Sequence, residues 1–154
     1  MATSAVFAVI DALVTTMTTA LPNVSVYDGL GTSDDPGNFL MIGVDDPDTD
    51  AYADSAESSQ KWAGLGNHAR NEEGTVTCCA LAWNGDGDQR AARLDVKAIT
   101  DAVENALRAD PSLGGVIAPP GWAQFGTRFN LSQIQSETGA LALAFFQVAY
   151  QARI

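Results

Sequence analysis

Few residues of this chain could support catalysis. His68 is the single histidine, and no Gly-x-Ser-x-Gly motif accompanies it, so we interpret it as a loop histidine rather than a general base. The adjacent Cys78 and Cys79 with one histidine do not give the four ligands of a zinc site. Gly29-Leu-Gly31 lacks the third glycine of a dinucleotide-binding loop, and no Gly-Lys-Ser/Thr phosphate loop occurs. We therefore expect no catalytic residue, no cofactor and no enzymatic activity.

An acidic segment partly imitates a calcium-binding loop. Its side chains fit positions 1, 3, 5, 7, 9 and 12 of that motif: Asp46, Asp48, Asp50, Tyr52, Asp54 and Glu57. Position 6, normally glycine, is Ala51, and Pro47 stiffens position 2. Residues 38–44 before the segment read as a strand rather than a helix. We interpret the segment as a solvated acidic loop and expect no metal site, with calcium binding as the alternative.

Large aromatic and isolated basic side chains are the candidates for protein contacts. Trp62 and Trp122 stand beside glycines and prolines in segments that we expect to be loops. Each could fold back on the domain or dock onto a neighbour, because tryptophan supplies much of the energy of protein interfaces. Lys61 and Arg70 are isolated among acids and could pair with an adjacent subunit or within the chain. These four residues are the predicted inter-subunit or partner contacts.

The charge balance excludes several classes of partner. The chain has 154 residues, 19 of them acidic and 8 basic, so its net charge is −11. A negative field opposes specific binding to nucleic acid or to anionic membranes. We find no signal peptide and no membrane span in the sequence, and we expect two buried thiols in a reducing cytoplasm. With 46% hydrophobic residues, the chain can close the core of one domain.

Apolar spacing predicts two helices and several strands. Apolar residues recur every three or four positions over residues 4–20 and 89–109, which indicates amphipathic helices, the first capped by Ser4. Strands are expected at 24–27, 38–44, 74–83, 115–118 and 124–133, followed by 140–153. We expect 24–27 and 38–44 to form a hairpin, and 45–73 to be an extended acidic loop. The prediction is one α+β domain, residues 1–154, with two helices packed on a mostly antiparallel or mixed sheet.

Several short motifs resemble a known family. They occur at Val26–Gly29, in the strand 38–44, at Trp62–Arg70 with Glu72 or Glu73, at Gly74–Thr77 and at Leu113–Gly115. Their order and the chain length are similar to those of tail terminator (tail completion) proteins of long-tailed bacteriophages that infect actinobacteria. The resemblance covers nearly the whole chain.

This resemblance implies a structural viral protein of the virion, located at the tail neck and assembled in the host cytoplasm. Its subunits would form a homo-oligomeric ring, usually a hexamer, on the head-proximal end of the tail tube. The ring would stop polymerisation of the tail tube protein and present a surface for head-tail joining to the head connector. Genome DNA would pass through the lumen without specific binding, and acids lining that lumen would repel its phosphates.

Other classes of protein stay open. A head-closure protein or another neck or minor tail component has a similar size and also forms rings; binding to the portal side rather than to the tube end would identify it. A small calcium-binding module, or an enzyme using acids such as Asp45, Asp46 and Glu73, is the remaining alternative.

Overall fold

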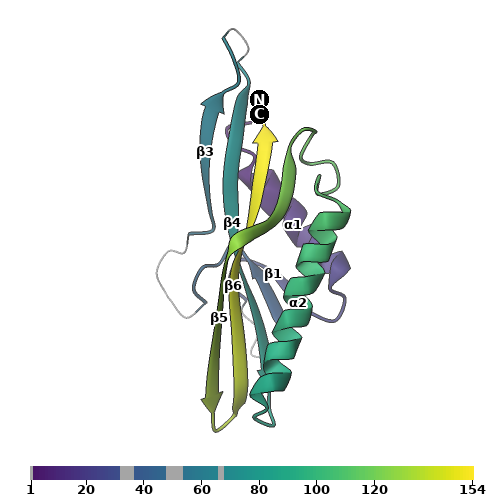
Figure 1. Ribbon diagram of the computed structural model, residues 1–154, viewed down its shortest axis with the longest axis vertical. Coiled ribbons are helices and arrows are strands. Elements are labelled where there is room, and N and C mark those ends of the chain that lie inside the picture. The colour runs from purple at the N-terminus through teal and green to yellow at the C-terminus, as the bar shows by residue number, and fades with distance from the viewer. Residues whose placement is uncertain (1, 32–36, 48–53, 66–67) are drawn as a thin grey trace.

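The computed structural model describes residues 2–31, 37–47, 54–65 and 68–154, and it has an α+β architecture. Two helices and six strands follow one another as α1 (Val6–Ala20), β1 (Ser25–Asp28), β2 (Phe39–Ile42), β3 (Ala56–Trp62), β4 (Arg70–Asn84), α2 (Gln89–Ala109), β5 (Trp122–Ser136) and β6 (Gly139–Arg153). The strands form one mixed sheet and both helices lie against it (Figure 1). The predicted fold class is confirmed at this level.

The sheet is built around β4 and β6, two long antiparallel strands of 15 residues each. The strand order is β1-β2-β4-β6-β5, and β3 pairs with the first half of β4 on the same side as β2. Among the pairs formed by the described strands, only β1–β2 is parallel. The turn between β5 and β6 uses Gly139 at φ 139°, where an added Cβ would lie 2.3 Å from the carbonyl oxygen of Asn84.

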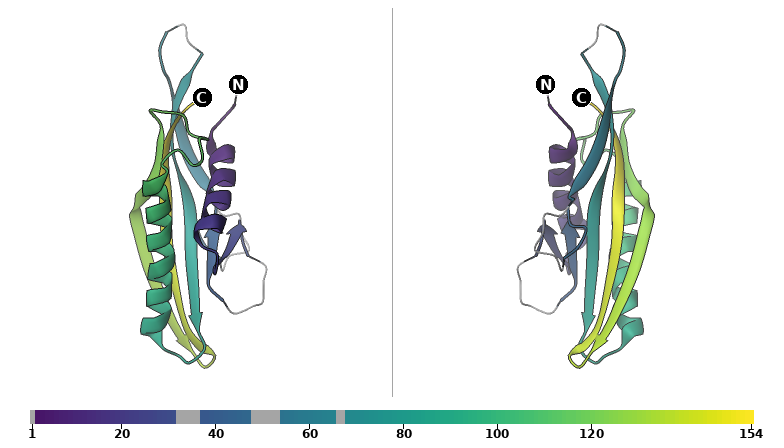
Figure 2. Two further views of the ribbon diagram at one scale, coloured as in Figure 1. Left: turned by 90° about the vertical axis from the view of Figure 1, so that its right-hand side faces the viewer. Right: turned by 90° about the vertical axis from the view of Figure 1, so that its left-hand side faces the viewer.

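Both helices cover one face of the sheet, as the two side views show (Figure 2). α2 begins with Asp88, whose side chain accepts a hydrogen bond from the backbone N–H of Ala91. The core between the layers combines leucine, valine and methionine of the helices with a column of small residues on β4 and β6. That column includes Ala80, Ala82, Ala142 and Ala144, and its small size lets the helices approach the sheet closely. No helix in the described part of the chain is long and apolar enough to cross a membrane.

Three local predictions are wrong. The strands predicted at 24–27 and 38–44 are parallel neighbours rather than a hairpin. Much of the predicted loop 45–73 is strand: β3 occupies 56–62 and β4 already begins at Arg70. Residues 115–118 form turns instead of a strand, with Gly114 and Gly115 at positive φ. In the remaining predicted loop, residues 48–53 and 66–67 lie outside the described residues.

The two adjacent cysteines form no disulfide and are buried on opposite faces of β4. Burial raises the pKa of the Cys78 thiol to about 12, because the apolar surroundings disfavour the thiolate. Since only the thiolate is a good nucleophile, we expect a thiol reagent at pH 8 to label the native protein at least about a hundredfold more slowly than the unfolded one. A colorimetric thiol assay with and without guanidinium measures both rates. Rapid labelling of the folded protein would contradict this burial.

Candidate functional site

The most prominent feature for contacts is a hairpin formed by β3 and the start of β4, which we call the arm (residues 56–76). Residues Ala56–Trp62 of β3 pair antiparallel with Val76–Arg70 of β4. The end of the arm extends past the last strand residues of β6 and past the chain termini (Figure 1). Trp62 and Leu65 are exposed at this end, so the arm presents apolar surface to the outside.

Three of the four predicted contact residues meet on the arm. Trp62 lies directly opposite Arg70 in the strand register, and the guanidinium carbon of Arg70 is 5.9 Å from the centre of the Trp62 ring. Lys61 is the neighbour on β3 and pairs with Asn71. Trp62 nevertheless remains 69% exposed, so it does not fold back into the core.

Trp122 is separate from this group. It begins β5, pairs with Gln151 on β6 and is half-buried. Two strands, β6 and β4, therefore lie between Trp122 and β3. The sequence prediction grouped the four residues by type alone, whereas the structure brings together only Lys61, Trp62 and Arg70.

The arm contains a buried carboxylate, Glu72, which lies opposite Gln60 and two residues from Arg70. Glu72 is 0% exposed and its two oxygens accept four hydrogen bonds. The donors are the Ser4 hydroxyl at 2.9 Å, the Ala5 backbone N–H at 3.1 Å, the Gln60 amide at 2.5 Å and the Tyr150 hydroxyl at 2.6 Å. Because Ser4 and Ala5 precede α1, Glu72 places a negative charge at the positive end of that helix.

This carboxylate also corrects the predicted start of α1. Ser4 was expected to cap the helix, and its hydroxyl does accept a hydrogen bond from the backbone N–H of Val6. The N-cap residue is Ala5, which has no side chain for this purpose. Its own N–H is bound by Glu72, 67 positions along the chain. The helix start is therefore completed by a tertiary contact.

The network continues from Glu72 to the exposed arm. Gln60 donates to Glu72 and accepts from the Arg70 guanidinium at 2.6 Å. Arg70 also donates to the carbonyl oxygens of Ala2 and Thr3, at 3.2 and 3.4 Å. Arg70 is thus held by neutral acceptors of its own chain, and it keeps a fixed position beside Trp62.

Tyr150 closes the network from β6. Burial, followed by the hydrogen bond to Glu72, raises the pKa of the Tyr150 phenol well above its usual value. The phenol therefore stays protonated and donates to the carboxylate. Because the pKa in the folded state exceeds that of an unfolded tyrosine, the stability gained from this phenol is complete below about pH 10 and is lost as the pH rises further.

Sequence reasoning did not identify Glu72 as a buried residue. The signal was present in the strand alternation: Glu72 is in phase with Val76 and Cys78, which face the core, whereas Glu73 is in phase with exposed positions. Because residues 45–73 were predicted to be a loop, the alternation was not applied to Glu72 and Glu73, which belong to β4.

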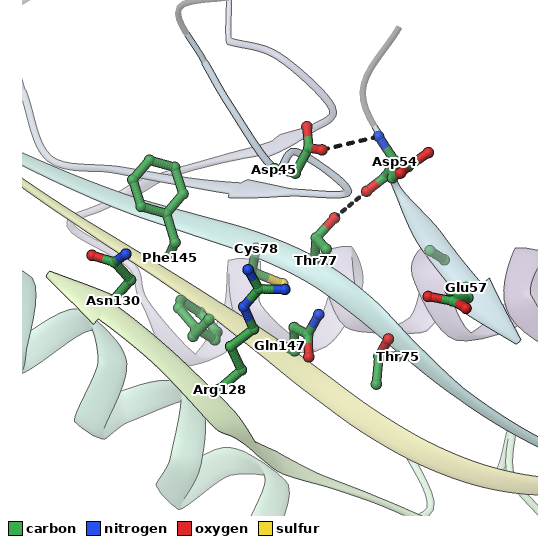
Figure 3. A pocket seen from close by; sticks show the side chains of 12 residues that line it. Asp45, Asp54, Glu57, Thr75, Thr77, Cys78, Arg128, Asn130, Phe145 and Gln147 are labelled. Carbon is green, nitrogen blue, oxygen red and sulfur yellow. Dashed lines mark hydrogen bonds between the residues drawn. The ribbon is translucent and has the colours of Figure 1, made fainter. Parts of the chain in front are cut away.

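A second feature is a groove of about 390 Å³ on the face of the sheet that the helices leave open (Figure 3). Asp45, Asp54 and Glu57 lie along one side, and Arg128 approaches from β5 on the other. The Asp54 backbone N–H donates to Asp45 at 3.3 Å, and its carbonyl accepts from the Thr77 hydroxyl at 2.5 Å. The two ion pairs found among the described residues both lie within α2, so Arg128 takes part in neither.

The described part of the groove brings together no cluster of potential metal ligands. Among the described residues, no three His, Cys, Asp or Glu side chains are close enough together to hold a metal ion. Glu57, the twelfth position of the calcium-like pattern, lies in strand β3, where that motif would continue as a helix. Asp48, Asp50 and Tyr52 of the pattern fall outside the described residues. His68 is exposed near the end of the arm, away from this groove.

The arrangement is suited to protein contact: an exposed aromatic side chain on a strand hairpin, held in place by a buried hydrogen-bond network. No protein-family description and no curated protein sequence matches the chain.

Proposed function

We propose that this chain is a structural virion protein that caps the head-proximal end of a bacteriophage tail tube, ends tube polymerisation and forms the head-tail joining surface. The proposal starts from the resemblance of its motifs to tail terminator proteins. Several of these motifs lie in the arm. Trp62–Arg70 is at its end, and Glu72 and Gly74 follow on β4.

The observation that carries the proposal is the arm itself. Exposed apolar side chains that lie close together mark interaction surfaces, and Trp62 and Leu65 are both exposed at one end of the molecule. The Glu72 network connects Gln60 and Arg70, the neighbours of Trp62, before any partner binds. Such preorganisation reduces the entropy lost on association, which favours a role in assembly.

In the proposed ring the subunits are copies of this chain, and the outer partners are the tail tube protein and the head connector. The acids near the groove would face passing DNA without binding it, because like charges repel. We expect Asp45→Asn and Asp54→Asn together to slow genome ejection in assembled phage. Unchanged ejection would show that these acids do not repel DNA in the lumen.

Trp62 provides a direct test of the arm. We expect Trp62→Ala to weaken self-association or tube binding by roughly tenfold or more, because a buried interface tryptophan contributes about 2 kcal/mol. The thermal unfolding midpoint should change little, since the side chain is exposed in the isolated subunit. Leu94→Ala is the matched control, because Leu94 is an exposed apolar residue on α2. Equal effects of both substitutions would refute a specific role for the arm.

Light scattering of the purified protein, with electron microscopy of the same sample, tests the assembly. Rings that are indifferent to a calcium chelator are the expected result. A monomer whose thermal stability rises with calcium would contradict the proposal and favour a calcium-binding module. Rings that bind the portal side rather than the tube end would identify a head-closure protein.

A further inference from the structure

The outer edge of β5 is unusually open to association. β5 ends the sheet, and among the described residues only β6 pairs with it. Phe129, Leu131 and Ile134 are each about half exposed along it. The strand is long, has no proline or lysine, and carries a single charge, Arg128. Natural edge strands are normally protected against pairing by short length, charge, proline or a β-bulge, and β5 has only Arg128 and the register shift between Phe125 and Phe129.

The opposite end of the sheet has the complementary charge. β1 is the terminal strand there and is only four residues long, with Asp28 exposed at its end. The sequence from Leu21 to Gln60, which includes β1 and β2, contains no lysine or arginine. By contrast, no acidic residue occurs from Pro111 to Ser136, the segment that includes β5. The two edges therefore attract rather than repel each other.

The strand register shows which residues of β1 and β5 lie on the same row of the sheet. Asp28 pairs with Ile42, which continues through Cys78 and Phe146 to Phe129 on β5. In the same way, Val26 lies on one row of the sheet with Leu131. The pairings also make β1 and β5 run in opposite directions. A second copy placed beside the first in the same orientation would thus continue the sheet with an antiparallel pair.

We propose that β5 of one subunit pairs antiparallel with β1 of a neighbouring copy of this chain, so that identical subunits join head to tail. Phe129 and Leu131 would lie beside Asp28 and Val26 of the neighbour, and Arg128 would approach the neighbour's acidic edge. A two-fold contact between two β5 strands would instead bring the two Arg128 side chains into one interface. The head-to-tail contact rests on the proposed ring, because only a heterologous contact repeats around a closed ring.

Disulfide trapping tests this contact in the full-length chain. The variant that combines Asp28→Cys with Phe129→Cys cannot bridge internally, because four strand spacings of about 4.8 Å separate the two positions. We expect oxidation to give a ladder of covalent oligomers that ends at the size of the ring. Asp28→Cys with Leu131→Cys tests a pairing shifted by two residues on the same face. Each single variant is a control and should form no ladder.

The outcomes separate the contact from the function. Rings without a ladder from either pair would overturn the contact and leave the proposed function intact. Covalent dimers of Phe129→Cys alone would overturn it in favour of a two-fold contact. A ladder from a protein that never binds tail tubes would support the contact and refute the terminator function.

Charge reversal gives an independent measure. We expect Arg128→Glu to raise the protein concentration needed for half assembly by roughly tenfold, because it places an acid beside the acidic edge of the neighbour. Arg90→Glu changes the net charge equally, at an exposed position in the first turn of α2, and should leave assembly unchanged. An equal loss of assembly with Arg90→Glu would show that the loss comes from net charge alone, and it would overturn the proposed β5–β1 contact.

Discussion

Replacing Glu72 by alanine is expected to lower the free energy of unfolding by about 3–4 kcal/mol, which corresponds to a fall of roughly 10 °C in the unfolding midpoint. The carboxylate accepts hydrogen bonds from Ser4, Ala5, Gln60 and Tyr150. Its removal leaves several of these donors buried without a partner, and each such group costs about 1–3 kcal/mol. Chemical denaturation followed by circular dichroism measures the change.

Glu73→Ala is the matched control for this prediction. Glu73 is the next residue on β4, is exposed on the open face and has one long hydrogen bond, 3.4 Å, from Gln151. Its replacement should change stability by no more than about 0.5 kcal/mol. If Glu72→Ala costs no more than Glu73→Ala, the carboxylate does not hold the arm to the body.

A double-mutant cycle with Tyr150→Phe resolves how the network is coupled. Tyr150 contacts Glu72 directly, so the two changes should not be additive. We expect a coupling free energy of about 1–2 kcal/mol, because either substitution alone already removes the hydrogen bond between Tyr150 and Glu72. Strict additivity would mean that the two groups stabilise the fold independently.

Replacing Gly74 by alanine is the second substitution with a large expected effect. Gly74 lies opposite Tyr150 in the β4–β6 register, and a Cβ there would be 2.6 Å from the Tyr150 hydroxyl oxygen and 2.7 Å from its ring. Tyr150 is only 1% exposed and is held by Glu72, so it cannot move aside without breaking the network. We expect a loss of about 2–3 kcal/mol in the free energy of unfolding, from overpacking and the weakened hydrogen bond.

Gly64→Ala makes the control for Gly74→Ala. No atom lies within 4 Å of a Cβ built at Gly64, near the end of the arm, so alanine fits there. Stability should stay within about 0.5 kcal/mol of the parent chain. Equal stability of both variants would show that the Tyr150 ring does not require glycine on β4.

Periodicity predicted those elements whose pattern is set by local burial. The helices around Val9 and Val96 and the alternation of Val76, Cys78 and Ala80 were all recognised, because each has one apolar face against the core.

Strand β3 could not be predicted in this way. Both its faces are largely exposed, and its sequence from Ala56 to Trp62 shows no apolar alternation. It is a strand because β4 supplies its hydrogen-bond partners. The parallel pairing of β1 with β2 likewise depends on a connection whose path no local pattern specifies.

The candidate site was predicted by residue type and not by arrangement. Lys61, Trp62 and Arg70 were singled out because isolated bases and tryptophans often make contacts, and the arm brings them together. Their support from Glu72 and Tyr150 spans 78 positions of the chain, so it follows from the sheet register alone.

Binding to tail tubes tests the central claim most directly. Purified protein is mixed with polymerising tail tube protein, and the tubes are examined by electron microscopy with a label on this chain. We predict one labelled ring at a single end of each tube, and shorter tubes as more protein is added. Tubes that grow to their usual length with both ends unlabelled would contradict the proposed function.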